Sequence, residues 1–187
     1  MRAPHFGGIW EAAVKVAKGH LYRSLQNTKL SFEELATALC EIEAVMNSRP
    51  ITPLTNDPND FEALTPGHLL IGTSMRAIPE PSDANTNPDI LPYWRRINNV
   101  KSHFWQRWQK EYLQELQQRS KWASKSPNIA VGSMVVVHED NLPPMRWSLG
   151  RIQKTFPGED GNVRVAEIRT AKGTIKRPIH KLALLPC

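Results

Sequence analysis

Proline is distributed very unevenly along this chain of 187 residues. Eight of its 15 prolines lie within residues 50–92, whereas residues 93–122 contain neither proline nor glycine. Proline interrupts helices and removes a hydrogen bond from a central strand, so residues 51–91 are predicted to be a connector with only short elements. The stretch that follows can form one long helix.

Two helices are predicted before the connector. The first begins at Glu11, and its apolar residues recur at helical spacing. They are Trp10, Val14, Ala17, Leu21 and Leu25. The second follows Ser31, which forms a capping-box pattern with Glu34. Its predicted buried face consists of Phe32, Leu35, Leu39, Ile42 and either Val45 or Met46. Within the connector, Thr65 and Pro66 are typical of the start of a short helix.

Residues 92–126 are expected to form a helical arm after the connector. One face of this helix is an apolar stripe, and its other faces carry Arg and Lys side chains. The stripe consists of Trp94, Ile97, Val100, Phe104, Trp108 and Tyr112. Trp105 and Trp122 lie off this stripe, so they are candidates for stacking on bases.

The last segment, residues 127–187, alternates short β-type runs with turns. Runs at 134–138, 147–156, 162–170 and 174–178 are predicted strands, and Asp160-Gly161 and Lys172-Gly173 suit hairpin turns. About sixty residues with four or five short strands suit a small SH3-like barrel. The predicted fold class is therefore α+β.

The net charge of +6 is the sum of two unlike parts. Residues 1–92 carry 7 Lys+Arg against 11 Asp+Glu, whereas residues 93–187 carry 17 against 7. Such asymmetry favours a nucleic-acid or membrane contact by the basic half. No apolar run is long enough to span a bilayer, so a membrane partner is not expected.

Glu11, Lys15 and Lys18 share one face of the first predicted helix, because they are four and three residues apart. A carboxylate beside two ammonium groups suits a site where metal ions meet a phosphate backbone. The ordinary alternative is a surface ion pair of Glu11 with Lys15, worth a few tenths of a kcal/mol, about 0.2–0.5.

The segment around Gly8-Ile9-Trp10-Glu11 resembles the last catalytic block of retroviral and retrotransposon integrases, most closely those of Bel/Pao-type polyproteins. Residues 47–51 and 64–70 also look like segments of these polyproteins. The later runs Tyr93-Trp94-Arg95-Arg96, Phe104-Trp105-Gln106-Arg107-Trp108 and Trp147-Ser148-Leu149-Gly150-Arg151-Ile152 look like their uncharacterised C-terminal domain.

This resemblance implies that residues 1–50 are the last two helices of an RNase H-like catalytic core. Glu11 would be the third carboxylate of an Asp, Asp, Glu triad that holds Mg²⁺ or Mn²⁺ in the intact enzyme, and Lys15 and Lys18 would face the DNA end. Both aspartates precede the Glu in the family, and only ten residues precede Glu11 here. We therefore expect a rear portion of an integrase that binds no metal and is catalytically incompetent alone.

The resemblance and the charge together predict a nuclear DNA-binding protein that acts in DNA integration, with chromatin as a further candidate partner and an oligomer in the intact enzyme. The residues expected to contact DNA, besides Lys15 and Lys18, are Arg95, Arg96, Lys101, Arg107, Arg151, Arg164, Lys176 and Arg177. One alternative is a non-enzymatic chromatin or histone-tail binding module, for which Trp147 and Phe156 are the main candidates for an aromatic cage. Another is an enzyme completed by a partner that supplies the two aspartates.

Overall fold

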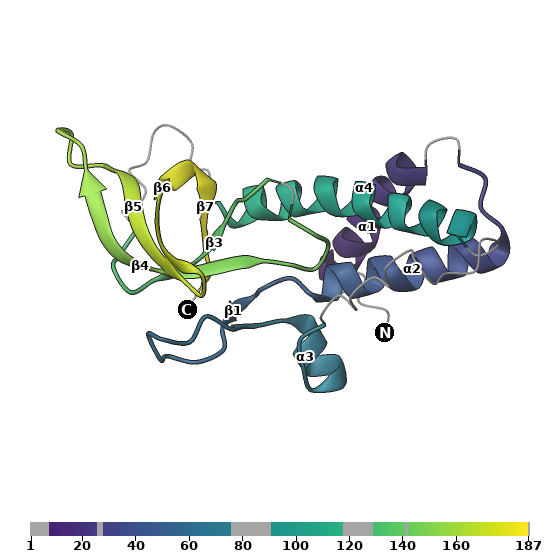
Figure 1. Ribbon diagram of the computed structural model, residues 1–187, viewed down its shortest axis with the longest axis horizontal. Coiled ribbons are helices and arrows are strands. Elements are labelled where there is room, and N and C mark those ends of the chain that lie inside the picture. The colour runs from purple at the N-terminus through teal and green to yellow at the C-terminus, as the bar shows by residue number, and fades with distance from the viewer. Residues whose placement is uncertain (1–7, 26–27, 76–90, 118–128, 141, 187) are drawn as a thin grey trace. The chain divides into compact units, whose positions relative to one another are not determined.

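A computed structural model describes residues 8–25, 28–75, 91–117, 129–140 and 142–186. The chain divides into a helical unit, residues 1–43 and 78–108, and a sheet unit, residues 44–77 and 109–187. Helices and an antiparallel sheet are both present, so the α+β class is confirmed (Figure 1). The predictions on Trp122 and on an exposed linker at residues 79–89 of the connector fall outside the described residues.

Helix α1 (Gly8–Leu25) begins three residues earlier than predicted. Its buried face was also predicted wrongly, because Val14 is 49% exposed whereas His20 and Ser24 are buried. Both polar side chains are accommodated locally. The Ser24 hydroxyl donates to the His20 carbonyl at 2.8 Å, and the His20 ring lies edge-on to Phe104 with centroids 5.8 Å apart.

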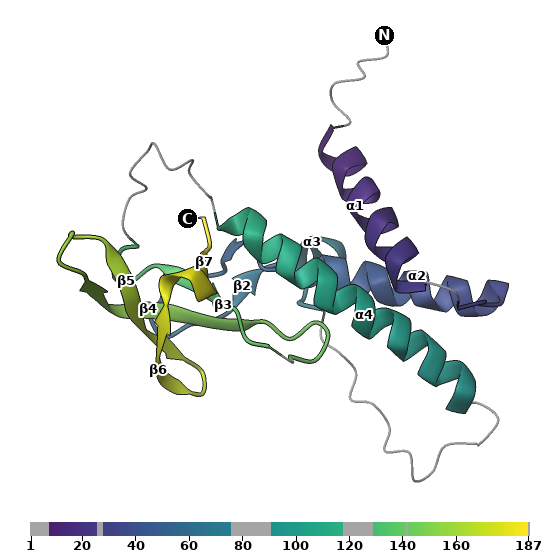
Figure 2. The ribbon, with the colours of Figure 1, turned by 90° about the horizontal axis from the view of Figure 1, so that it is seen from above.

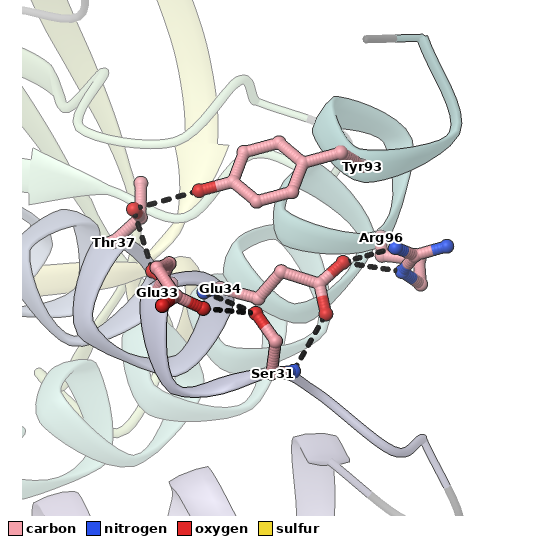
Figure 3. Close-up of polar contacts among 6 residues, drawn as sticks. All are labelled: Ser31, Glu33, Glu34, Thr37, Tyr93 and Arg96. Carbon is pink, nitrogen blue, oxygen red and sulfur yellow. Dashed lines mark hydrogen bonds and ion pairs between the residues drawn. The ribbon is translucent and has the colours of Figure 1, made fainter. Parts of the chain in front are cut away.

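Helix α2 (Phe32–Asn47) starts where the sequence predicted, and the capping box is confirmed. The backbone N–H of Ser31 donates to Glu34 Oε2 at 2.7 Å, and the backbone N–H of Glu34 donates to Ser31 Oγ at 3.2 Å (Figure 3). The buried face differs from the prediction. Phe32 is 83% exposed and Leu39 45% exposed. The buried positions are Glu34, Ala38, Ile42 and Val45.

Helix α4 (Leu91–Leu116) is the predicted long helix. Its stripe of Ile97, Val100, Phe104 and Trp108 is buried as expected. Trp105 is buried too, with 1% of its surface exposed, so it is no candidate for base stacking in this structure. These five buried apolar side chains therefore make the helix hydrophobic on a broad face.

The connector holds two short strands and one short helix, as its prolines allow. Strands β1 (Thr52–Pro53) and β2 (Ala63–Leu64) pair antiparallel. Helix α3 (Pro66–Ile71) follows Thr65 as predicted, and Gly72 ends it in the left-handed conformation with φ 77°. Glycine adopts that conformation without steric cost.

Five strands form the sheet in the order β6-β5-β4-β3-β7, with antiparallel neighbours throughout (Figure 2). They are β3 (Met134–Val137), β4 (Ser148–Pro157), β5 (Val163–Thr170), β6 (Gly173–Pro178) and β7 (Leu182–Leu184). The first four correspond to predicted strands, and β7 follows a 3-10 helix, η3 (Ile179–Lys181). We expected a closed barrel, whereas within the described residues no ladder joins the edge strands β6 and β7.

The two faces of β3 serve different clusters, which explains why all four of its residues are buried. Val135 and Val137 pack with Ile152, Ile168 and other residues inside the sheet's curve. Met134 and Val136 pack on the opposite face, in a cluster completed by Leu113, Ala63 and Leu185 among others. The second face of β3 is thus covered by the end of α4 and by β2. Farther along the same face of the sheet, Lys154, Arg169 and Lys176 of β4, β5 and β6 are exposed.

Candidate nucleic-acid interface

The uncovered face of β4, β5 and β6 carries an array of cations set by the strand register. Side chains alternate along β5, so Ala166, Ile168 and Thr170 are buried on one face and Arg169 is exposed on the other. Directly paired residues share a face. The exposed face can therefore be followed across the three strands, and we call it the basic face.

Three cross-strand rows make up the basic face. Residues of β4, β5 and β6 stand opposite one another in each row. The rows are Phe156, Val165 and Pro178; Lys154, Glu167 and Lys176; and Arg151, Arg169 and Thr174. A bulge between Ile152 and Lys154 keeps Arg151 and Lys154 on this same face although they are three residues apart. An apolar row thus borders two rows rich in cations.

The middle row contains the closest charge contacts of the basic face. Lys176 Nζ lies 3.7 Å from Glu167 Oε2. The ammonium groups of Lys154 and Lys176 also lie 5.3 and 5.0 Å from the centroid of the Phe156 ring. Lys154 and Arg169 are exposed and Phe156 is partly exposed. The arrangement presents positive charge beside an aromatic ring, which suits contact with phosphates.

Four cations of the sheet were predicted to contact DNA, and the structure brings only two of these to the basic face. Lys176 lies in its middle row. Arg151 is on the face but donates to the carbonyls of Asp60 at 3.2 Å and Thr55 at 2.9 Å, so it holds the β1–β2 loop to the sheet. Arg177 alternates with Lys176 and pairs with Ala166 of the buried face.

Arg164, the fourth predicted contact, lies at the hairpin between β4 and β5. Its guanidinium binds Asp160 Oδ2 at 3.0 Å. The Asn162 side chain and backbone N–H, followed by Arg164, lower the pKa of Asp160 to about 2. Asp160 therefore stays ionised throughout the physiological range, so it can pair with Arg164 across that range although the Arg164 side chain is 71% exposed.

In the helical unit, two of the predicted DNA contacts are engaged in ion pairs between helices. Arg96 of α4 binds the carboxylate of Glu34 through Nε at 2.7 Å and also through Nη2 (Figure 3). Lys101 Nζ lies 3.3 Å from Glu41 Oε2 and retains only 12% side-chain exposure. These contacts tie α4 to α2. Arg95 and Arg107 are exposed and remain accessible to an anionic partner.

Glu11, Lys15 and Lys18 lie on α1 and are all exposed. The described residues contain no group of three or more His, Cys, Asp or Glu side chains that could hold a metal ion. A two-metal centre needs several converging carboxylates. The residues described around Glu11 therefore do not fit the Mg²⁺ or Mn²⁺ pair of an integrase, and we derive no catalytic step for them. No described helix is long and apolar enough to cross a membrane.

The two rings proposed for an aromatic cage do not meet. Trp147 packs against the cluster on the second face of β3, and its indole N–H donates to Ser48 Oγ at 3.2 Å. Phe156 lies nine residues along β4, which corresponds to roughly 30 Å of strand. Trp147 instead borders a cleft of about 440 Å³, where it meets residues from the segments 47–51 and 64–70, among them Pro50 and His68.

Lys154, Arg169 and Phe156 were not among the residues predicted to contact DNA, although Phe156 was a candidate for the aromatic cage. A period-2 pattern, with Lys154 and Phe156 two residues apart, would have placed those two on one face. Arg169 and Lys176 lie on the same face because of the strand register. That register includes a β-bulge between Ile152 and Lys154, which local sequence patterns do not predict.

Residues 92–185, just over half of the chain, match a family of unknown function, DUF5641. This stretch contains most of α4 and the whole five-stranded sheet, so the basic face lies within the matched part. The chain therefore belongs to the DUF5641 family. No curated protein matches the chain.

Proposed function

We propose that this chain is the DNA-binding C-terminal part of a retroelement integrase of the Bel/Pao type, that it acts in DNA integration in the nucleus, and that it is catalytically incompetent alone. The family match covers the stretch whose motifs resemble the C-terminal domain of Bel/Pao-type polyproteins. Helices α1 and α2 would then belong to the end of an RNase H-like core. DNA is the proposed partner, with chromatin as the setting.

The observation that carries the proposal is the basic face of β4, β5 and β6. Lys154, Arg169 and Lys176 project from three neighbouring strands, and Glu167 is the acidic residue among these rows. Cations on a rigid sheet bind phosphates with little loss of conformational freedom in the backbone. Contacts of this kind position a protein on DNA without reading its sequence.

The strand connections support an SH3-like assignment for the sheet. Five strands follow one another in sequence, a 3-10 helix precedes the last, and that last strand β7 pairs with the first strand β3. The proposed role of the sheet as a DNA-binding module is consistent with the SH3-like end of retroviral integrases, which the sequence resembles.

Binding of the full chain to a fluorescent DNA duplex at several salt concentrations tests the proposal. Three phosphate contacts predict that log K falls with log[salt] with a slope of about −2.7, because each contact contributes about −0.9. Lys154→Glu and Lys176→Glu should each weaken binding and make the slope shallower. Lys29→Glu is the matched control, because Lys29 is an exposed cation at the start of the α2 capping segment, outside the sheet unit. Salt-independent binding, or equal effects of the three substitutions, would contradict the proposal.

Catalysis is tested separately with a strand-transfer assay in Mn²⁺. The purified chain should give no product, because the described residues contain no group of three or more His, Cys, Asp or Glu side chains that could hold a metal ion. Product that disappears in Glu11→Gln would tie catalysis to this site, and the proposed incompetence would be wrong.

A further inference from the structure

Phe156 is the only aromatic residue of the three strands that form the basic face. Across the strands it pairs with Val165 and Pro178, which are also partly exposed. The ring is therefore part of an apolar strip that runs beside the charged middle row. Two ammonium groups stand within 5.3 Å of its centroid.

An aromatic ring in this position gains little from a partner that presents only phosphates, because a ring interacts best with the flat face of a base. In a duplex the faces of the bases are stacked on one another, and exposing one costs a few kcal/mol. A single strand presents both its phosphates and the faces of its bases. Proteins that bind single strands combine cations along the backbone with aromatic side chains on which bases stack.

We propose that the basic face prefers single-stranded nucleic acid, with one base stacked on Phe156 and the neighbouring phosphates bound by Lys154 and Lys176. This rests on the proposed nucleic-acid function and adds a substrate class and a residue that contacts it. Val165 and Pro178 extend the apolar surface on which the base lies.

The two lysine contacts with the ring do not prevent stacking. A cation over an exposed ring contributes about 0.5–1 kcal/mol, so the two lysines together contribute about 1–2 kcal/mol. Stacking of a base on an aromatic side chain contributes about 1–3 kcal/mol. Each displaced ammonium group also gains a phosphate partner. The exchange therefore favours the base, and the flexible stems of the lysines let both groups move aside.

The test compares the full chain and its variants on a fluorescent oligo(dT) strand and on a hairpin duplex of equal charge. Phe156→Leu keeps an apolar side chain but removes the flat ring, so affinity for the single strand should fall on the order of 5- to 100-fold, with little change on the duplex. Phe156→Trp should restore or strengthen single-strand binding. Phe32→Leu is the matched control, because Phe32 is 83% exposed and lies on α2.

A readout that needs no variant is ultraviolet crosslinking of the unmodified chain to a 5-iodouracil strand, which should attach at Phe156. Crosslinks confined to other residues would overturn the inference, as would equal losses on strand and duplex in Phe156→Leu. Binding of the duplex alone would also refute the stacking role while the proposed DNA binding stood. Failure to bind either nucleic acid would refute both the stacking role of Phe156 and the proposed DNA binding.

Discussion

Tyr112 offers a test of packing in the sheet unit that can be followed by pH. Its hydroxyl donates to the Pro50 carbonyl at 2.5 Å, and its ring meets Trp147 edge-on with centroids 5.7 Å apart. Burial raises the pKa of Tyr112 to about 12, an effect that the Arg49 guanidinium partly opposes. The residue joins the end of α4 to the segment that follows α2 and to the start of β4.

The raised pKa means that the folded chain favours the neutral phenol. Stability from Tyr112 is complete below the unfolded pKa near 10 and is lost as pH rises from 10 through 12. A shift of two units corresponds to about 2.7 kcal/mol, and partial exposure to solvent reduces this to about 2 kcal/mol. At neutral pH, Tyr112→Phe removes one hydrogen bond and should lower the free energy of unfolding by about 1 kcal/mol.

The order of stability of wild type and Tyr112→Phe should therefore reverse between neutral and high pH. Wild type is more stable at pH 7, and Tyr112→Phe becomes more stable by about 1 kcal/mol near pH 12, because phenylalanine has no proton to lose. Urea unfolding followed by tryptophan fluorescence at a series of pH values measures this. Tyr22→Phe is the control, since Tyr22 is 81% exposed and makes no comparable packing. A difference between wild type and Tyr112→Phe that stays constant from pH 7 to 12 would refute the reasoning.

Three further predictions concern local contacts. A Cβ at Gly150 would lie 2.5 Å from a side-chain carbon and 2.7 Å from a carbonyl oxygen of β5, so Gly150→Ala should destabilise the sheet unit by about 1–3 kcal/mol in urea. Its control, Gly19→Ala, adds a methyl group in open space within a helix and should stabilise by up to about 1 kcal/mol. Glu34→Gln retains an acceptor for the capping box but loses its charge, so thermal midpoints should fall in the order wild type, Glu34→Gln, Glu34→Ala. The carboxyl signal of Asp160 in an NMR titration should move with a midpoint of about 2, and Arg164→Ala should raise that midpoint.

Features that depend on neighbouring residues could be predicted from the sequence. The capping box at Ser31 and Glu34 satisfies its own amides, and Pro66 needs only the first turn of a helix to be favourable. The turns at Gly161 and Gly173 require positive φ, which both glycines adopt, at 75° and 123°. Each of these signals acts within a few residues, so tertiary packing does not alter it.

The buried faces of α1 and α2 could not be predicted in the same way. Their apolar stripes have helical spacing, but burial depends on what packs against each side. Glu34 is buried because Arg96 approaches from α4, and that pairing spans 62 residues. Phe32 and Leu39 are exposed for the same reason, since the described neighbours of α2 lie on its other side. The hydrophobic period indicates a helix more securely than it indicates which face is covered.

The net charge of +6 is a poor measure of how much of this chain can bind phosphate. Arg96 and Lys101 neutralise acids of α2, Arg151 is held by carbonyls, and Arg164 is held by Asp160. These four cations of the basic half stabilise the fold, so their charge is screened by partners before any nucleic acid arrives. Lys154 and Arg169 lie exposed on neighbouring strands, and Lys176 is held by Glu167 at 3.7 Å, a longer ion pair than those of Lys101 and Arg164. Anionic partners are then attracted chiefly by these three cations. That is why the salt dependence of binding should report about three contacts rather than the total charge of the basic half.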